Sequence, residues 1–366
     1  MKSARSVRIL TGISVTVLAI SAISALAFGT VNASINKIDA FAGLDKRPDK
    51  KSSAVNYLLV GSDTREGLTK AELKALRVGS VATAAGKRSD TMLLVHISKA
   101  RDKAIIISIP RDSFALIPQH TKPSGKVTPA VYSKINSSFN WGGAPLLIQT
   151  LEEMTQLKID HYIEMNFVGF ARVVDSLGGI EVCTKKDIDD PKSHLVLEAG
   201  VHTLNGIEAL KYVRTREFDG MGDIGRMQRQ QAFMSSILKK ATSAGVLLNP
   251  ITMTNFINSS LSAVTTDEGL KNSDLITLAK QMKSLATSNV RTLTVPLSDL
   301  NYYSNGVTAS VLWDPVLAPE LWQRLREDRA VVDEVMPSPS PSSTAAPKVE
   351  IIDKFKTRTA EDNICR

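Results

Sequence analysis

The sequence has 366 residues, of which 43% are apolar and 22% are charged. These proportions are typical of a globular protein, and they exclude general disorder as a description of the whole chain. The formal net charge of +8 suits a nucleic acid, an anionic lipid or a phosphorylated ligand, and charge alone does not choose among them. At this length we expect one large core with appendages rather than two medium domains.

The N-terminal segment predicts a membrane anchor. Lys2, Arg5 and Arg8 precede residues 9–28, a run of twenty residues without a charge, which is long enough for a helix to span a bilayer. Positive charges before the span predict a cytoplasmic segment at residues 1–8 and an exported body. We therefore expect a single-pass type II protein of the cell membrane whose main domain is extracytoplasmic. A cleaved signal peptide, for which residues 25–33 offer small side chains, is the alternative.

The rest of the chain predicts one layered α/β domain. The expected divisions are a stalk at residues 29–54, the domain at 55–335, a Pro/Ser-rich flexible linker at 336–348 and a tail at 349–366. Short runs of Val, Ile and Leu between turn residues predict strands at residues 55–61, 91–98, 104–110, 162–165 and 290–296. Apolar residues at helical spacing predict helices at residues 142–157, 166–177, 205–215, 225–240, 273–286 and 315–329. Because strands alternate with helices, a layered α/β domain follows.

The sequence contains two cysteines, Cys183 and Cys365. In an exported protein they are candidates for a disulfide that would attach the tail to the domain. Two separate thiols are the alternative. Neither cysteine lies in a metal-ligand spacing, and the five histidines form no zinc-binding motif and no triad with serine or cysteine.

Charged residues gather at predicted strand ends and loops, positions that carry function in α/β sheets. Arg226 and Gln230 are four residues apart, so a helix places both on one face. Arginine forks bind phosphate oxygens bidentately, and several converging arginines suit a pyrophosphate. Asp63 and Asp90 are then candidates to hold a cation that bridges the phosphates, Mg²⁺ or Mn²⁺. In isolation, Asp90 also fits a turn or helix cap, and Arg111 fits a surface ion pair.

Seven motifs occur along residues 55–240. They are GSDTR, KRSDTMLLVHIS, SIPRDS, KIN, VVDSLGGIEV, LNGIEALKYVRTR and GDIGRMQRQQ. Each alone is a weak signal, but together, behind one predicted membrane span, they resemble the LytR-CpsA-Psr family. The resemblance implies α-β-α layers with a central mixed sheet. It also implies an enzyme that transfers a wall glycopolymer from a polyprenyl-pyrophosphate carrier to the muramic acid of peptidoglycan.

The resemblance also implies roles for individual residues. Asp63 and Asp90 are expected at the metal, and together with Arg111 they are the expected catalytic residues. The residues expected around the pyrophosphate are Arg111, Lys134, Arg214, Arg216, Arg226 and Gln230. The lipid part of the carrier implies an apolar channel between sheet and helices, whose candidate lining residues are Phe167, Phe170, Val173, Val174 and Leu177. An ordinary core helix is the alternative for these five residues. Residues 66–87 resemble an insertion near the site.

In the implied reaction, a hydroxyl of the acceptor sugar attacks the phosphorus that bears the polymer, and polyprenyl phosphate leaves. Arginines and the metal stabilise the growing negative charge, and Asp63 or Asp90 is the candidate base. The expected partners are the lipid-linked glycopolymer, peptidoglycan and the membrane, with no nucleic acid.

Three other functions compete with this one. A polyprenyl-pyrophosphate phosphohydrolase would use the same groups with water as the nucleophile. A noncatalytic lipid-binding wall scaffold would bind the lipid and catalyse no reaction. A membrane-anchored transcription attenuator is disfavoured, because the eight residues before the span are too few for a DNA-binding domain.

Overall fold

The computed structural model describes residues 35–62, 89–122, 124–216, 219–220, 222–241, 243, 245, 250–271, 274, 289–335 and 350–359. The predicted anchor at residues 9–28, nearly all of the predicted helix at 273–286 and the predicted linker at 336–348 lie outside these residues. Within the described part of the chain, no helix is both long and apolar enough to cross a membrane.

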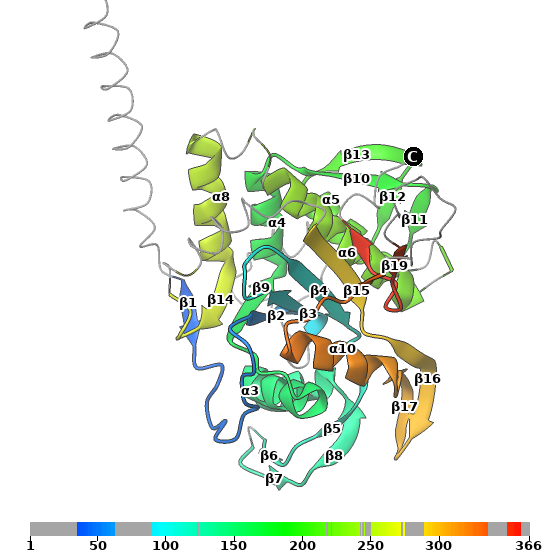
Figure 1. Cartoon of the computed structure of the whole chain (residues 1–366). Helices are drawn as coiled ribbons and strands as arrows, with labels where there is room; N and C mark the ends of the chain where they lie inside the picture. The colour runs from blue at the N-terminus through cyan, green and yellow to red at the C-terminus, as the bar shows by residue number, and fades with distance from the viewer. Residues whose placement is uncertain are drawn as a thin grey trace, which may run out of the picture.

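A mixed sheet of eight strands forms the centre of the molecule (Figure 1). In spatial order the strands are β1 (Asn36–Ile38), β14 (Val264–Asp267), β9 (His161–Asn166), β2 (Val55–Ser62), β3 (Ser89–Ile97), β4 (Ala104–Ile109), β15 (Val290–Thr294) and β20 (Arg358–Thr359). Strand β2 runs parallel to β9 and antiparallel to β3, and β4 runs parallel to β15. Every residue of β4 is buried, as expected for a central strand that is covered on both faces.

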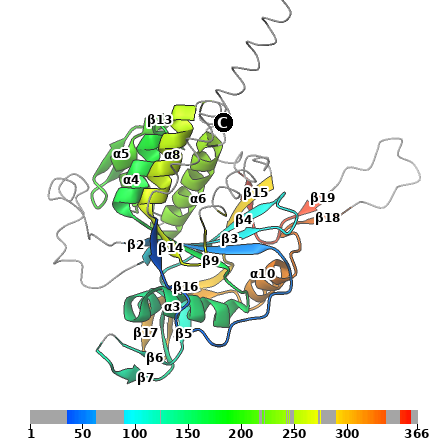
Figure 2. The same ribbon diagram turned by 90° about the vertical axis from the view of Figure 1, so that its left-hand side faces the viewer.

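Helices cover both faces of this sheet (Figure 2). The helices on one face are α3 (Asn136–Thr155) and α10 (Leu317–Arg326). Those on the other face are α4 (Phe167–Ser176), α5 (Gly206–Tyr212), α6 (Gly222–Ala241) and α8 (Pro250–Ala263). The predicted α-β-α layers with a central mixed sheet are confirmed for the described part of the chain.

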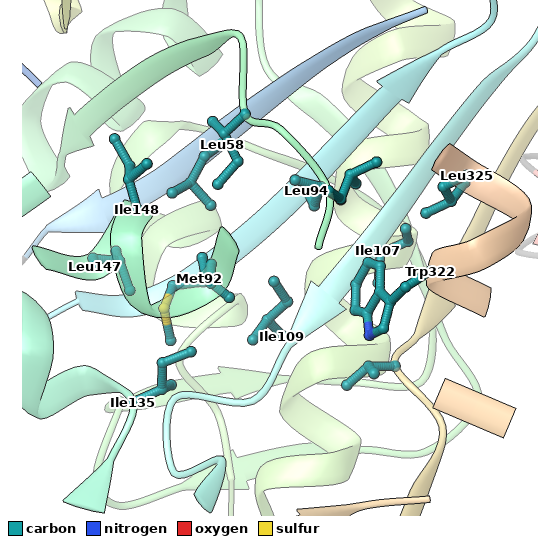
Figure 3. Close-up of a cluster of buried hydrophobic side chains, with 14 of the residues drawn as sticks. Leu58, Met92, Leu94, Ile107, Ile109, Ile135, Leu147, Ile148, Trp322 and Leu325 are labelled. Atoms are coloured by element: carbon teal, nitrogen blue, oxygen red, sulfur yellow. The ribbon is translucent and has the colours of Figure 1, made fainter. Parts of the chain in front are cut away.

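The main core lies between the sheet and the pair α3 and α10 (Figure 3). Leu58, Met92 and Ile107, from the three central strands, meet Leu147 of α3 and Trp322 of α10 there, and each of these five side chains is at most 2% exposed. Successive strand residues point to opposite faces of a sheet. The neighbouring residues Leu59 and Leu93 therefore face α4, α5 and α6, and that second layer contains the candidate site.

Two glycines bring the helices of this second layer close together. Helix α4 begins after Asn166, whose side chain accepts a hydrogen bond from the backbone N–H of Gly169 at 2.8 Å. A Cβ atom at Gly169 would overlap Ala263 at the end of α8, and one at Gly206 would overlap the backbone of Ala171. Since even an alanine would force α4 away from α8 and α5, these contacts fix the helix that carries the predicted lipid-lining residues.

Short two-stranded hairpins surround the main sheet. They are β5 (Phe114–Ile117) with β8 (Val131–Lys134), β6 (His120–Thr121) with β7 (Val127–Thr128), β10 (Ile180–Thr184) with β13 (Gly200–Leu204), β11 (Ile188–Asp190) with β12 (Leu195–Leu197), β16 (Leu297–Ser304) with β17 (Val307–Trp313), and β18 (Asp333–Val335) with β19 (Glu350–Ile352). The β5–β8 and β16–β17 hairpins are joined to each other. The Val311 N–H donates to the Asp112 carbonyl at 2.8 Å, and Trp313 Nε1 donates to Ser113 Oγ at 2.9 Å.

The folded region extends beyond the ranges that the sequence pattern delimits. Within residues 29–54, which we assigned to a stalk, β1 pairs with β14, and Ala40 is fully buried in the core. Within the predicted tail at 349–366, β20 pairs with β15 and Phe355 packs in the core. Segments this short carry too few residues for a periodic signal, so tertiary contacts determine where they lie.

Candidate functional site

A large cavity of about 430 Å³ lies between the sheet and helices α4, α5 and α6. Its walls are mostly apolar. From the sheet they are Leu59, Val60, Leu93, Ile163 and Met165, and from the helices they are Phe167, Phe170, Val173, Leu210, Phe233, Met234 and Ile237. The rings of Phe170 and Phe233 lie 5.5 Å apart between centroids. Apolar surface of this kind accepts an apolar ligand without leaving buried polar groups unsatisfied.

The polar residues that line the large cavity come from one end of the sheet and the segments above it. They are Thr91 on β3, Asn166 at the end of β9, Lys192 between β11 and β12, Arg214 and Arg216 after α5, and Arg226 and Gln230 on α6. The C-terminal ends of the parallel strands β2 and β9 meet here, which is where α/β sheets commonly bind ligands. Four of the six predicted pyrophosphate-binding residues therefore line one cavity.

A small cavity of about 210 Å³ adjoins the large one. The two cavities share Thr91, Leu93, Arg226 and Gln230 as lining residues. The other walls of the small cavity are formed by residues after β4, including Arg111 and Asp112, and by Leu297, Leu300 and Val311 of the β16–β17 hairpin. Arg226 and Gln230 thus lie on the boundary between the two cavities.

Buried hydrogen bonds fix the segment that carries Arg214 and Arg216. Asp190 is 1% exposed, and its carboxylate accepts hydrogen bonds from the backbone N–H groups of Lys192, Ser193 and Arg216 at 3.0, 2.8 and 2.5 Å. The guanidinium carbon of Arg214 lies 5.2 Å from the ring centre of Phe167, a cation–π distance. These contacts hold the side chain of Arg214 beside the apolar wall of the cavity. They also hold the backbone of Arg216 against the buried carboxylate of Asp190.

Side chains of helix α6 also hold the segment that carries Arg214 and Arg216 in place. Arg229 is 8% exposed; its guanidinium donates to the Thr215 carbonyl at 2.6 Å and forms an ion pair with Asp219. The Gln230 amide nitrogen donates to the Val213 carbonyl at 3.2 Å. Tyr212, at the end of α5, is buried, and burial raises the pKa of its phenol, so its ring contributes packing rather than charge.

The PRDS and KIN motifs meet through backbone and side-chain contacts. The Ile135 N–H donates to the Ser113 carbonyl at 2.8 Å, and the Asn136 N–H donates to the Arg111 carbonyl at 3.1 Å. Asp112 lies between two cations, 3.5 Å from Arg111 Nε and 3.5 Å from Lys134 Nζ. Lys134 lines neither cavity and reaches the site through Asp112.

The predicted metal ligands are only partly described. Asp63 lies outside the described residues, and of Asp90 the structure describes the backbone. Gly61 pairs with Thr91 and Ser62 with Ser89, so Asp90 is the extra residue of a β-bulge at the end of the β2–β3 hairpin, a feature that redirects the chain and is frequent beside active sites. Among the side chains that the structure describes, no three of His, Cys, Asp or Glu gather in a possible metal site.

The other predicted site residues divide into two groups. Phe167, Phe170 and Val173 line the large cavity. Val174 and Leu177, expected beside them, do not line it but pack in the core of the helical layer at 0% and 3% exposure; they lie one and two turns further along the chain than Phe170, at the C-terminal end of α4. Cys183 is disulfide-bonded. Its predicted partner Cys365 lies outside the described residues.

Sequence reasoning missed several residues of this site. Lys192 and Asp190 come from a short hairpin without a motif, and no sequence signal marks them. Asp112 belongs to the SIPRDS motif. Its place in the sequence, directly after Arg111 and before Lys134, could have identified it as a site residue. The apolar residues of α6 that complete the cavity are Phe233, Met234 and Ile237. Their helical spacing could have identified them as candidate lining residues.

Comparison with known proteins places these features in a family. The model of the LytR_cpsA_psr family matches residues 25–323. A probable cell wall biosynthesis protein, LcpB of Corynebacterium glutamicum, is 35% identical over 292 residues, which are 80% of this chain and 65% of that protein. TagT of Bacillus subtilis, a polyisoprenyl-teichoic acid–peptidoglycan teichoic acid transferase, is 35% identical over 204 residues, which are 54% of this chain and 56% of that protein.

A solved structure of TagT bound to LIIa-WTA is also similar, with a TM-score of 0.55 at 25% identity, covering 79% of this chain and 98% of that one. The chain spans 65% of the length of LcpB and 56% of the length of TagT. The family match extends over most of the chain, including both cavities and the arginines that line them. The chain therefore belongs to the LytR_cpsA_psr family.

Proposed function

We propose that this protein is a phosphotransferase that moves a glycopolymer from a polyprenyl-pyrophosphate carrier to a muramic acid hydroxyl of peptidoglycan and releases polyprenyl phosphate. The observation that carries the proposal is the continuity between an apolar cavity and a group of guanidinium side chains at one end of it. A lipid that ends in a pyrophosphate has the same two-part character. The names of the similar proteins, a cell wall biosynthesis protein and a teichoic acid transferase, support the same class of reaction.

The size and lining of the large cavity suit part of a polyprenyl chain. Its volume of about 430 Å³ falls within the range of roughly 300–1,000 Å³ that is usual for small-molecule sites. Each buried methylene contributes about 0.8 kcal/mol, so ten of them contribute about 8 kcal/mol. Partial insertion therefore suffices for firm binding, while the rest of a long carrier stays in the membrane.

The arginines suit the pyrophosphate and its transition state. Arg214, Arg216 and Arg226 line one cavity together, and planar guanidinium groups bind phosphate oxygens bidentately. Arg111 and Arg226 line the small cavity on the other side. Phosphoryl transfer depends mainly on positioning and on stabilisation of charge over the phosphoryl oxygens, and fixed guanidinium groups supply both.

We further propose that Asp63 and Asp90 hold Mg²⁺ or Mn²⁺. The pairing of Ser62 with Ser89 supports this, because the residues that directly precede Asp63 and Asp90 in the sequence lie side by side, next to Gly61 and Thr91 of the cavity wall. Such a cation, when bound, neutralises phosphate charge. The same two carboxylates are the candidates for the base that accepts the proton of the attacking hydroxyl.

In the proposed reaction, the acceptor hydroxyl oxygen forms a bond to the phosphorus that bears the polymer. The bond from this phosphorus to the bridging oxygen breaks, polyprenyl phosphate leaves, and the hydroxyl proton passes to the base. The product is a phosphodiester between polymer and glycan. The membrane anchor at residues 9–28 and the extracytoplasmic location are part of the proposal, since carrier and peptidoglycan would meet there.

The decisive experiment supplies the full chain in detergent with a labelled lipid-linked oligosaccharide and peptidoglycan. Label joined to the glycan supports the transferase, whereas free labelled oligosaccharide with no joined product supports the phosphohydrolase. No consumption of the lipid-linked substrate, with or without Mg²⁺, would support a noncatalytic scaffold. The matched negative control is the Arg226→Ala protein, which retains the cavity but lacks one guanidinium group.

A further inference from the structure

The small cavity has a different composition from the large one. Its lining includes no residue of α4 or α5, whose apolar side chains form much of the large cavity. Its outer walls are instead Arg111 and Asp112 and, from the β16–β17 hairpin, Leu297, Leu300 and Val311. The two cavities therefore approach the shared residues Arg226 and Gln230 from different sides.

The proposed reaction assigns a different substrate to each of these two cavities. In phosphoryl transfer the attacking and the leaving oxygens lie roughly in line, on opposite sides of the phosphorus. With the polyprenyl chain in the large cavity, the leaving polyprenyl phosphate lies on that side of Arg226. The attacking hydroxyl must then arrive from the side of the small cavity.

Beyond the small cavity lies a surface that we call the hairpin face, defined by Phe114, Tyr132, Leu300 and Tyr302. The rings of Phe114 and Tyr132 stack at 5.0 Å with 6° between their planes, and Tyr302 meets Phe114 edge-on at 5.1 Å. Tyr132 and Leu300 are 41% and 53% exposed. Leu300 belongs to both regions, since it also lines the small cavity.

The hairpin face has the chemistry that binds sugars. The C–H groups of a pyranose ring pack against aromatic rings, whereas the phenol oxygens hydrogen-bond to sugar hydroxyls. The β5–β8 side of this face is basic, because residues 113–151 contain no Asp or Glu but include Lys122, Lys126 and Lys134, although Lys134 lies 3.5 Å from Asp112 and the β16 side carries the exposed Asp299. A glycan strand whose peptide stems carry carboxylates complements both properties.

We propose that the small cavity holds the acceptor sugar and that the hairpin face binds the adjoining part of the acceptor glycan, an inference that rests on the proposed transferase function. The glycan strand lies across Tyr132 and Leu300 and extends its reacting hydroxyl past Leu300 toward Arg226. The donor occupies the opposite cavity. Acceptor affinity and donor affinity therefore depend on different residues.

The test measures transfer by the full chain at varied concentrations of a soluble, uncrosslinked peptidoglycan fragment and of a lipid-linked oligosaccharide. In Tyr132→Ala and Leu300→Ala proteins we expect the KM for the fragment to rise about tenfold, as a lost ring or side-chain contact predicts. The KM for the lipid-linked donor should stay the same. Tyr132→Phe, which keeps the ring, should restore most of the acceptor affinity.

Ile351→Ala is the matched control for Leu300→Ala, because Ile351 is 57% exposed on the separate β18–β19 hairpin. Unchanged acceptor KM in both alanine variants would overturn the inference, and so would a rise in the donor KM alone. If the unmodified protein transfers nothing, the proposed function fails. In that case, the affinity of the same variants for the peptidoglycan fragment, measured without donor, shows whether the hairpin face binds the acceptor glycan.

Anionic vesicles of phosphatidylglycerol and phosphatidylcholine separate a glycan surface from a membrane surface. If the alanine variants lose vesicle binding but bind the glycan fragment as the unmodified protein does, the hairpin face contacts lipid and the inference is wrong. Equal vesicle binding by all variants, together with weaker fragment binding, supports it.

Discussion

Arg226 and Gln230, one turn apart on α6, line both the large apolar cavity and the small cavity beside Arg111. Arg226 is only 4% exposed, and Gln230 is fixed by its hydrogen bond to the Val213 carbonyl. The helix therefore presents a cation and an amide at the one boundary that both substrates of the proposed reaction would share. This placement makes α6 the element on which transfer should depend most.

Replacing Arg226 tests this dependence. We expect Arg226→Ala to lower the rate of transfer about 10²- to 10³-fold, because one fixed stabiliser of transition-state charge is lost. Arg226→Lys should recover part of the rate, since it restores the charge without the bidentate fork. The control is Arg358→Ala, an exposed arginine of β20 that lines neither cavity. Full activity of a folded Arg226→Ala protein would contradict the proposed site.

Asp190 should position the arginine segment without touching substrate. Asp190→Ala leaves the backbone N–H groups of Lys192, Ser193 and Arg216 without their acceptor, and each group that stays buried without a partner costs about 1–3 kcal/mol. We expect a Tm several degrees lower in thermal unfolding and weaker donor binding. Asp189→Ala, at the exposed neighbouring position of β11, should change neither. A normal Tm for Asp190→Ala would show that these hydrogen bonds are easily replaced.

The sequence predicts the central layer well because its signal is local. The strands expected at 55–61, 91–98 and 104–110 correspond to β2, β3 and β4, since continuous runs of Val, Ile and Leu are typical of strands buried on both faces. Helix ends were less accurate. The helix expected from residue 142 begins at Asn136, and a kink at Gly143, whose φ of +64° is not helical, separates its first turns from the rest. Glycine and proline near this kink resemble a helix boundary in the sequence, so the segment before it was not predicted.

The walls of the site depended on tertiary packing and were predicted only in part. An apolar face on a helix looks the same in sequence whether it meets a filled core or a cavity. Val174 and Phe170 illustrate this, because both are apolar residues of α4, yet Val174 packs in the core and Phe170 lines the cavity. The arginines were found because their motifs are distinctive, whereas the hairpin residue Lys192 had no motif to identify it.

Phe170 should contribute to lipid binding in proportion to the length of the lipid. Its ring lines the large cavity beside Phe233, so Phe170→Ser removes apolar surface and introduces a hydroxyl. We expect the affinity for a long polyprenyl phosphate to fall about tenfold, and that for a short analogue to fall less. Val196→Ser, 75% exposed on β12, is the control. Equal losses of affinity for long and short lipids would show that the polyprenyl chain binds outside this cavity.

Asp267 should make stability depend on acid pH. Burial raises the pKa of this carboxyl, but hydrogen bonds from His161 and from the backbone N–H groups of Tyr162 and Leu270 outweigh burial and lower the pKa below its usual value. A lowered folded pKa gives stability that is present above the unfolded pKa of about 3.9 and lost as the pH falls through the folded value.

Denaturant unfolding between pH 6 and pH 3 measures this effect. The unmodified protein should lose stability below about pH 4, and Asp267→Asn should be less stable at pH 6 but show a smaller decrease. Glu268→Gln, at the exposed neighbouring position, should keep the decrease of the unmodified protein. If Asp267→Asn and the unmodified protein show parallel pH curves, another group is responsible.

Metal removal tests the proposed role of Asp63 and Asp90. A chelator should stop transfer, and Mg²⁺ should restore it, because the cation would neutralise charge on the pyrophosphate. Asp63→Asn and Asp90→Asn should bind Mn²⁺ more weakly in a paramagnetic titration, a readout that needs no activity. Asp102→Asn is the control, since Asp102 lies in the turn between β3 and β4, at the opposite end of the strand that carries Asp90. Unaltered Mn²⁺ binding in both aspartate variants, with chelator-sensitive transfer, would place the metal on other residues, whereas chelator-resistant transfer would mean that the arginines stabilise the reaction alone.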